Sequence, residues 1–141
     1  MPPPLVNALV PFVHVASVDQ SLAFYAHLGF VPDSRLADQS DRAFWASAVS
    51  GKAKIMFAQS SGPINPDDQA VLFYMYSDDV KVLRTHLLAK GLHDGSVFSG
   101  AAGPNGGRKV VFEVTHPHYM PAGEIRVHDP DGYVILIGQL R

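Results

Sequence analysis

The side chains of this protein that could do chemistry are mainly those of histidines and carboxylates. Seven histidines are present and cysteine is absent, which excludes disulfides, thiolate metal sites and a cysteine nucleophile. His116 and His118 form an H-x-H pair in a proline-rich stretch, and His14 lies in an apolar stretch near the start. Imidazole and carboxylate groups suit zinc and iron, so these histidines could hold a metal together with Glu113 or Glu124. Their spacing matches no established ligand pattern, which favours ordinary loop and strand residues.

Glu124 and Arg126 form a second candidate site, because they alternate along a predicted strand and so share one of its faces. A four-residue hairpin loop would place that face with Ile135 and Ile137. A bulge at the turn would shift the register by one residue and place it with Leu136. Facing inward, the pair could form an ion pair or anchor a polar ligand. Facing solvent, it would be a surface salt bridge of little energetic consequence.

Aromatic residues on the predicted strands could supply the walls of a pocket, since small-molecule sites are mostly apolar with a few placed polar groups. Trp45 and Tyr74 are the strongest candidates, because a buried indole N–H or phenol hydroxyl needs a hydrogen-bond partner. For any single one of these residues, a place in the core is the simpler interpretation. The full set is Phe12, Phe44, Trp45, Phe57, Tyr74, Tyr76 and Tyr119.

In the first half of the chain, a strand, a helix and three further strands are predicted to position these residues. Residues 5–15 are apolar and β-branched and predict a strand, in which Pro11 indicates an edge or a bulge. Ser17 and Gln20 form a capping box, an apolar stripe follows at helical spacing, and Gly29 suits a C-cap, so a helix is predicted over 18–28. The further strands are predicted over 30–36, 43–49 and 54–58.

The same order of elements begins again after a polar linker at 60–69. The stretch 77–79 (SDD) supplies an N-cap, a second apolar stripe follows at helical spacing, and Gly91 ends it. The caps Ser17 and Ser77 lie 60 residues apart, and Gly29 and Gly91 lie 62 apart. This spacing indicates an internal repeat of a strand–helix–strands unit.

The second copy of the repeat has strands predicted over 70–76 and 110–115 and ends in a hairpin. Residues 99–107 have the composition of a mobile loop. The hairpin joins strands predicted at 124–128 and 133–137 through the turn sequence D-P-D-G, which runs from Asp129 to Gly132.

The composition indicates a folded protein of one domain. At 141 residues the chain can bury a sizeable core, and 47% hydrophobic with 17% charged residues is usual for such proteins. A net charge of −2 argues against nucleic acid or an anionic membrane as partner. No stretch approaches the roughly 20 apolar residues that span a bilayer, and no signal segment is present, so we expect a cytoplasmic protein. Nucleophile-elbow, Walker and dinucleotide-binding motifs are also missing.

Several short motifs lie at the ends of the predicted elements. In order along the chain they are 21–25 (SLAFY), 28–30 (LGF), 73–80 (FYMYSDDV) with 89–91 (AKG), and 129–133 (DPDGY). Together they resemble motifs of the vicinal oxygen chelate superfamily, which includes glyoxalase I, bleomycin- and fosfomycin-resistance proteins and extradiol dioxygenases. The resemblance implies an α+β fold of two βαβββ modules, at about 5–59 and 70–139, within one domain over residues 1–141. Curled mixed sheets would surround a cavity, with the helices outside.

The resemblance also implies where metal-using members of the superfamily bind their metal. Val10 stands where a histidine ligand of the first strand is usual, and Leu72 stands at the equivalent place in the second module. Leu136 stands where the last strand usually carries a carboxylate. Valine and leucine offer no lone pair to a metal ion, so no cofactor is expected. In the family, the position of Arg126 faces the cavity together with position 136, which favours an inward place for Glu124 and Arg126.

By this resemblance, we expect a glyoxalase/bleomycin-resistance-like protein that binds a small molecule in the sheet cavity without the usual metal site. Metal-free relatives sequester a cationic glycopeptide drug. The expected ligand-binding residues are Arg126, Glu124, His14, Trp45 and Tyr74. The resemblance further implies a homodimer, and neither nucleic acid nor membrane is expected as a partner.

The alternative is an enzyme of the same superfamily. It would be a lactoylglutathione-lyase-like lyase or a dioxygenase with relocated metal ligands such as His14 and Glu124. A metal-free isomerase would instead need one of these two residues for proton transfer.

Overall fold

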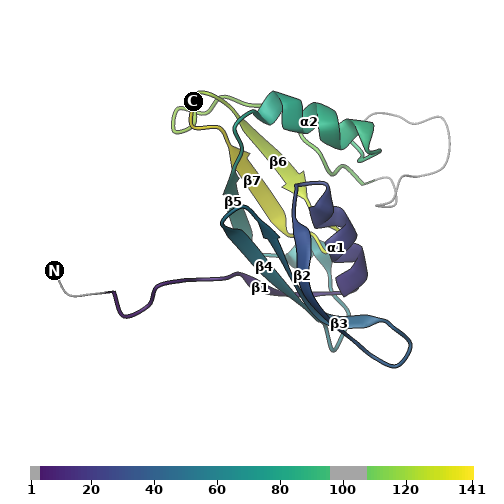
Figure 1. Cartoon of the computed structure of the whole chain (residues 1–141). Coiled ribbons are helices and arrows are strands. Elements are labelled where there is room, and N and C mark those ends of the chain that lie inside the picture. Colours follow the sequence, from purple (N-terminus) through teal and green to yellow (C-terminus); the bar gives the residue numbers. More distant parts are fainter. Residues whose placement is uncertain (1–3, 96–107) are drawn as a thin grey trace. The chain divides into compact units, whose positions relative to one another are not determined.

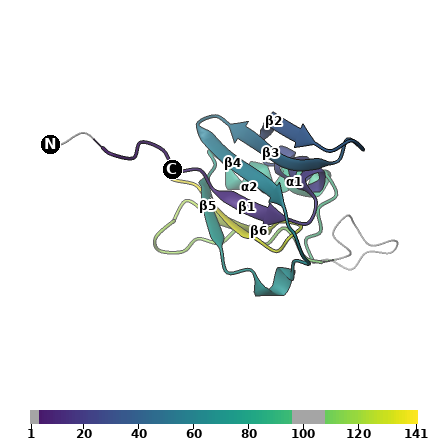
Figure 2. The same ribbon diagram turned by 90° about the horizontal axis from the view of Figure 1, so that it is seen from below.

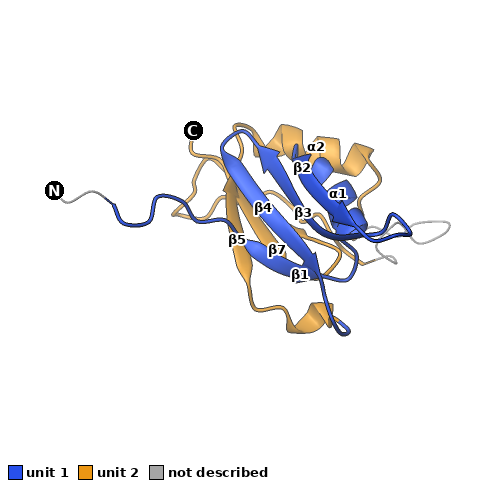
Figure 3. Cartoon of the chain, turned by 60° about the horizontal axis from the view of Figure 1, so that its bottom comes forward, with its two compact units in different colours: residues 1–63 blue, residues 64–141 orange. Residues whose placement is uncertain are grey.

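The chain folds as a strand, a helix and three strands, followed by a second set of helix and strands (Figure 1). The structure is a computed structural model that describes residues 4–95 and 108–141. Two compact units are present, Met1–Pro63 and Ile64–Arg141 (Figure 3), and each is described by itself. The elements are β1 (Phe12–Val15), α1 (Val18–Ala26), β2 (Val31–Ala37), β3 (Ala43–Ser50), β4 (Ala53–Gln59), the 3-10 turn η1 (Pro66–Asp68), β5 (Leu72–Tyr76), α2 (Val80–Ala89), β6 (Glu124–His128) and β7 (Val134–Gly138).

The first unit is a four-stranded mixed sheet in the order β1-β4-β3-β2 (Figure 2). β1 pairs with β4 in parallel, and the other pairs are antiparallel. Helix α1 contacts β2, β3 and β4, and the buried ring of Tyr25 lies 5.1 Å from that of Phe57. One face of this sheet is therefore covered by α1.

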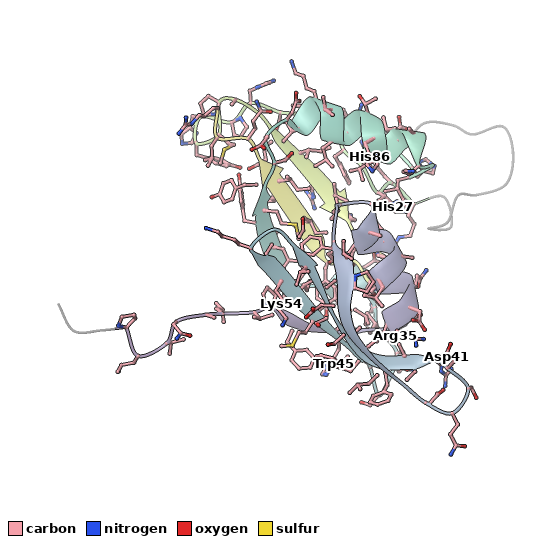
Figure 4. The ribbon with its side chains drawn as sticks, viewed as in Figure 1. His27, Arg35, Asp41, Trp45, Lys54 and His86 are labelled. Carbon is pink, nitrogen blue, oxygen red and sulfur yellow. The ribbon has the colours of Figure 1, made fainter. Side chains whose placement is uncertain are left out.

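Helix α1 forms where its capping residues predict it. The Oγ of Ser17 accepts a hydrogen bond from the backbone N–H of Gln20 at 3.2 Å, as an N-cap does. Gly29 ends the helical region with φ +93°, a conformation that favours glycine. Arg35 of β2 ties the helix to the sheet by bonding to Asp19 at 3.0 Å, and it also bonds to Asp41 (Figure 4). This guanidinium holds the pKa of Asp19 below its usual range.

The N-terminal strand is shorter than predicted, since β1 begins at Phe12 rather than at residue 5. Pro11 has no N–H to donate, and its carbonyl, which accepts from Met56 N at 2.9 Å, opens the pairing with β4. The apolar residues before it, Leu5, Val6 and Leu9, are exposed.

The second unit is a three-stranded sheet in the order β5-β7-β6. β5 pairs with β7 in parallel and β6 pairs with β7 antiparallel, the same pattern as β1, β4 and β3. Helix α2 contacts β6. The repeat predicted from the sequence is therefore present in both units, and the α+β fold class is confirmed.

Residues 110–115 pair with β6 but form no continuous strand, which corrects the prediction of a strand there. Phe112 N donates to Arg126 O at 3.0 Å, and Thr115 N donates to Glu124 O at 2.9 Å. Between these two hydrogen bonds the segment advances by three residues while β6 advances by two. The segment therefore contains one extra residue, as a β-bulge does. The loop predicted at 99–107 lies outside the described residues.

Helix α2 is capped by Asp79, the last residue of the predicted cap stretch 77–79, and not by Ser77, from which the repeat spacing was counted. The carboxylate of Asp79 accepts hydrogen bonds from the backbone N–H groups of Lys81 and Val82, both at 3.1 Å. The caps Ser17 and Asp79 then lie 62 residues apart, the same separation as Gly29 and Gly91. The two helices therefore begin at equivalent positions of the two modules, and α2 is one residue longer than α1.

The turn between β6 and β7 forms as its sequence predicts. The carboxylate of Asp129 accepts from the backbone N–H groups of Asp131 and Tyr133, both at 2.9 Å. Gly132 has φ +84°, and a Cβ there would collide with the backbone of Pro66. His128 pairs with Val134, so five residues rather than four connect the strands.

Candidate functional site on the three-stranded sheet

The register of the second unit gathers polar and apolar side chains on one face of its sheet. Arg126 lies opposite Leu136, which lies beside Tyr74, and the neighbouring rows follow the same alternation. The alternate side chains, Phe73, Ile125, Val127, Ile135 and Ile137, are buried and form the face toward α2. We call the opposite side the open face. Its residues are Leu72, Tyr74, Tyr76, Glu124, Arg126, His128, Val134, Leu136 and Gly138.

The bulged register expected from the resemblance is thus the one present. Glu124 and Arg126 share a face with Leu136 and not with Ile135 and Ile137. The additional residue in the hairpin loop produces this register, because each one-residue shift exchanges the two faces of a strand.

Glu124 is held between two tyrosines on the open face. The hydroxyl of Tyr74 donates to Oε2 of Glu124 at 2.6 Å, and the hydroxyl of Tyr119 donates to Oε1 at 3.0 Å. Tyr74 comes from β5, two strands away, and Tyr119 comes from the loop that precedes β6. Glu124 is buried, with 7% of its surface exposed, so these two donors replace the water that a surface carboxylate would bind.

Gly138 makes the Tyr74–Glu124 contact possible. Gly138 of β7 pairs with Tyr76 on one side and with Glu124 on the other. Because it is glycine, β7 places no side chain between these two residues. A Cβ at this position would lie 2.7 Å from the hydroxyl oxygen of Tyr74 and 2.9 Å from Cε of Met120. The phenol can therefore cross β7 only because this residue is glycine.

The electrostatics of this cluster keep both phenols protonated. The pKa of Tyr74 is raised well above its ordinary value of 10.0. The largest cause is burial of the hydroxyl, and the next are its hydrogen bond to Glu124 and the negative charge of Glu124. The hydrogen bond to Glu124 is also the largest cause of the raised pKa of Tyr119. Both residues remain partly exposed, Tyr74 to 40% and Tyr119 to 56%. The cluster thus presents aromatic surface around a carboxylate.

Arg126 does not pair with Glu124, which corrects the ion pair considered from the sequence. Its Nε donates to Nε2 of His128 at 2.9 Å, and its guanidinium carbon lies 5.3 Å from the ring centroid of Phe112. Burial, together with the positive charges of Arg126 and Arg108, lowers the pKa of His128. His128 is therefore neutral and can accept this hydrogen bond.

His14 and Trp45 belong to the first unit, on the face of its sheet turned away from α1. His14 pairs with Ala58, and Ala58 pairs with Trp45 on its other side, so the two candidates share one row of the sheet. His14 is exposed and Trp45 is half-buried. Of the other aromatic candidates, Phe57 is fully buried against α1, which agrees with the simpler interpretation of it as a core residue.

The residues at the expected metal positions do not fit a metal ion. Leu72 and Leu136 lie on the open face and offer no donor atom, and Val10 precedes β1. Among residues 4–95 and 108–141, no three histidine or acidic side chains gather closely enough to hold a metal. Two of the alternative ligands have other partners. His116 Nδ1 lies 3.0 Å from Pro121 O, and Glu113 pairs with Lys109 at 3.0 Å.

Two residues of the cluster were not selected as site residues from the sequence. Tyr119 was only one of several aromatic candidates, because nothing in its proline-rich loop shows which strand the loop approaches. Gly138 follows a buried strand and gives no local signal of its own. Only the register of β5, β7 and β6 reveals that it lies between Tyr76 and Glu124.

Comparison with known proteins identifies the fold. No protein-family model and no curated protein sequence matches this chain. Solved structures do match over almost the whole length. The crystal structure of a bleomycin resistance determinant encoded on the transposon Tn5 has a TM-score of 0.69 at 19% identity, covering 95% of this chain and 98% of that one. A bleomycin-binding protein from Streptomyces verticillus, complexed with copper(II)-bleomycin, has a TM-score of 0.63 at 18% identity, covering 96% and 98%. A glyoxalase-related enzyme from Clostridium phytofermentans has a TM-score of 0.68 at 10% identity, covering 96% and 95%.

The chain therefore has the glyoxalase/bleomycin-resistance fold, as the resemblance implied. Within the described part of the chain, no helix is long and apolar enough to cross a membrane.

Proposed function

We propose that this protein binds a small organic molecule on the open face of its second unit and uses no metal at the positions usual for the fold. The observation that carries this proposal is the cluster of Glu124, Tyr74 and Tyr119 over Gly138. A buried carboxylate with placed donors, set beside exposed aromatic and aliphatic surface, is the composition of a small-molecule site. Two of the structural relatives are complexes with bleomycin, which supports the same kind of role here.

The cluster supports binding better than proton transfer. Each oxygen of Glu124 already accepts a phenolic hydrogen bond. Both phenols have a raised pKa, so neither is a ready proton donor near neutral pH. A general base must lie within hydrogen-bond reach of the substrate proton. Glu124 is buried, so a substrate proton would have to reach its remaining lone pairs past the two tyrosines.

A thermal-shift screen tests the proposal. The protein, purified with and without a chelator, is screened against drugs and metabolites that include bleomycin. A ligand that binds the native state raises the melting temperature by mass action, and we expect at least one hit that needs no added metal. Elemental analysis of the protein purified without chelator should show no stoichiometric transition metal.

Two matched variants locate the binding site. Leu136→Gln changes a partly exposed residue at the centre of the open face, whereas Val82→Gln changes an exposed valine of α2. The ligand-induced shift should fall in the first variant and persist in the second. Equal shifts in both variants, or about one metal ion per chain, would contradict the proposal.

A further inference from the structure

Two opposite charges on the open face are kept apart instead of neutralising each other. Glu124 and Arg126 are two residues apart on β6 and project from the same face. Glu124 accepts from Tyr74 and Tyr119, while Arg126 donates to His128. Arg126 is exposed, and no carboxylate of the described residues forms an ion pair with it. Its charge is therefore open to a ligand.

His128 and Phe112 hold the guanidinium of Arg126 in one orientation. Nε of an arginine can only donate, so Nε2 of His128 must be the acceptor in their 2.9 Å contact. Phe112 lies 5.3 Å from the guanidinium carbon, and its ring is also 4.8 Å from the ring of His128. The hydrogen bond to His128 uses only the Nε–H group of the guanidinium. The two terminal nitrogens remain for a second partner.

The charges around this group favour an anion. Arg108 acts on His128 as a positive charge, and Lys109 lies 4.5 Å from the ring of Phe112. Each of these cations has an acidic partner, Asp67 for Arg108 and Glu113 for Lys109. Arg126 has none. Leu136 of β7 lies opposite Arg126. If the anionic group of a ligand binds Arg126, an apolar part of the same ligand can pack against Leu136.

From this geometry we propose that Arg126 is an anion-binding residue, which takes a carboxylate or phosphate group of a ligand through its two terminal nitrogens. His128 is its positioning residue. Two parallel N–H donors match the two oxygens of such a group, and this bidentate geometry is stronger than a contact with a point charge. This inference rests on the proposed function, because it names the chemical class of a ligand on the same open face.

An NMR titration with simple aromatic probes tests the inference. Benzoate and phenyl phosphate carry the two candidate anions, and benzamide is the neutral equivalent of benzoate. We expect at least one anion to perturb the side-chain Nε–H signal of Arg126 and the signals of Leu136, with an affinity about tenfold above that of benzamide. The stronger of the two anions identifies the group.

Substitutions separate the roles of the two residues. Arg126→Gln should abolish the preference for the anion, and Arg126→Lys should weaken it about tenfold because lysine lacks the fork. His128→Leu removes the acceptor and should weaken anion binding and shift the Arg126 Nε–H signal. His128→Gln offers a replacement acceptor and should restore both.

The outcomes distinguish this inference from the proposed function. Equal perturbation of the open face by benzamide and by the anions would overturn the anion site and leave small-molecule binding supported. An anion preference that persists in Arg126→Gln would overturn it as well. Absence of any perturbation of the open face up to millimolar probe would count against both.

Discussion

At the scale of single residues, the open face depends on a few side chains whose partners lie on other strands. Glu124 has one partner from β5 and another from the preceding loop. The contact with Tyr74 crosses β7 at Gly138, which leaves room for the hydroxyl. These three residues should therefore be energetically coupled, and a double-mutant cycle can measure the coupling.

Tyr74→Phe should lower the free energy of unfolding by about 1–2 kcal/mol, because a hydrogen bond to a carboxylate is charge-assisted. Gly138→Ala should destabilise the protein because its Cβ would lie 2.7 Å from the Tyr74 hydroxyl oxygen. In the double variant, Tyr74→Phe with Gly138→Ala, the steric clash with the hydroxyl is absent and only the clash between the new Cβ and Met120 remains. The two losses should therefore not add. Urea unfolding of the single and double variants measures this, and simple additivity would contradict the crossing geometry.

His128 should make stability dependent on pH. Its pKa in the folded protein is lowered by burial and by Arg126 and Arg108, whereas in the unfolded chain it is about 6.5. Between these two values the unfolded chain holds a proton that the folded protein lacks. The free energy of unfolding therefore falls as the pH drops from about 6.5 through the lowered pKa. His128→Gln should have a shallower fall in urea unfolding between neutral and acidic pH, and an unchanged slope would count against this assignment.

At the scale of elements, the hairpin of β6 and β7 fixes which side chains reach the open face. Its five-residue turn sets the register, and the register places Arg126 opposite Leu136. Asp129 closes the turn with two backbone hydrogen bonds, and Gly132 supplies the left-handed residue. A change that strains this turn should destabilise the sheet to which the candidate site belongs.

Gly132→Ala should lower the free energy of unfolding by more than about 1 kcal/mol, since alanine is strained at φ +84° and its Cβ would collide with Pro66. Gly62→Ala is a suitable control, because a Cβ there meets nothing within 4 Å. Thermal or urea unfolding compares the two. Equal effects would show that the turn conformation does not limit stability.

Most elements could be predicted from local patterns, because caps, terminal glycines and alternation act within a few residues. The helices and the hairpin strands follow from such signals, with boundaries that differ by a few residues. The segment 110–115 could not be predicted correctly, because its bulge depends on how it meets β6. The hydrogen bond of Tyr119 to Glu124 and the role of Gly138 could not be predicted for the same reason. Both depend on pairing between distant strands.

At the scale of the whole molecule, the chain keeps a known fold with little sequence identity. The three solved structures described above share 10–19% of residues with it at TM-scores of 0.63–0.69. The internal repeat explains how this fold could be predicted, because the helix N-caps and the glycines that follow the helices recur at the same spacing in both modules. The ligand could not be anticipated in the same way. It depends on side chains such as Arg126 and Tyr74, which vary without changing the fold.

We also propose that the protein is a homodimer, as the resemblance implies. β1 and β5 are edge strands of their sheets, so each has a row of backbone groups that no strand of its own sheet pairs. Natural proteins usually cover or protect such edges. Light scattering coupled to size exclusion should therefore give twice the chain mass at micromolar concentration. A single chain mass throughout that range would contradict the dimer.

A crystal structure of the protein with a ligand from the thermal-shift screen would show directly whether the open face binds a small molecule without a metal. We expect ligand density against Tyr74, Leu136 and Glu124, with no metal ion between ligand and protein. Ligand bound at another face, or held through a metal ion, would contradict this expectation.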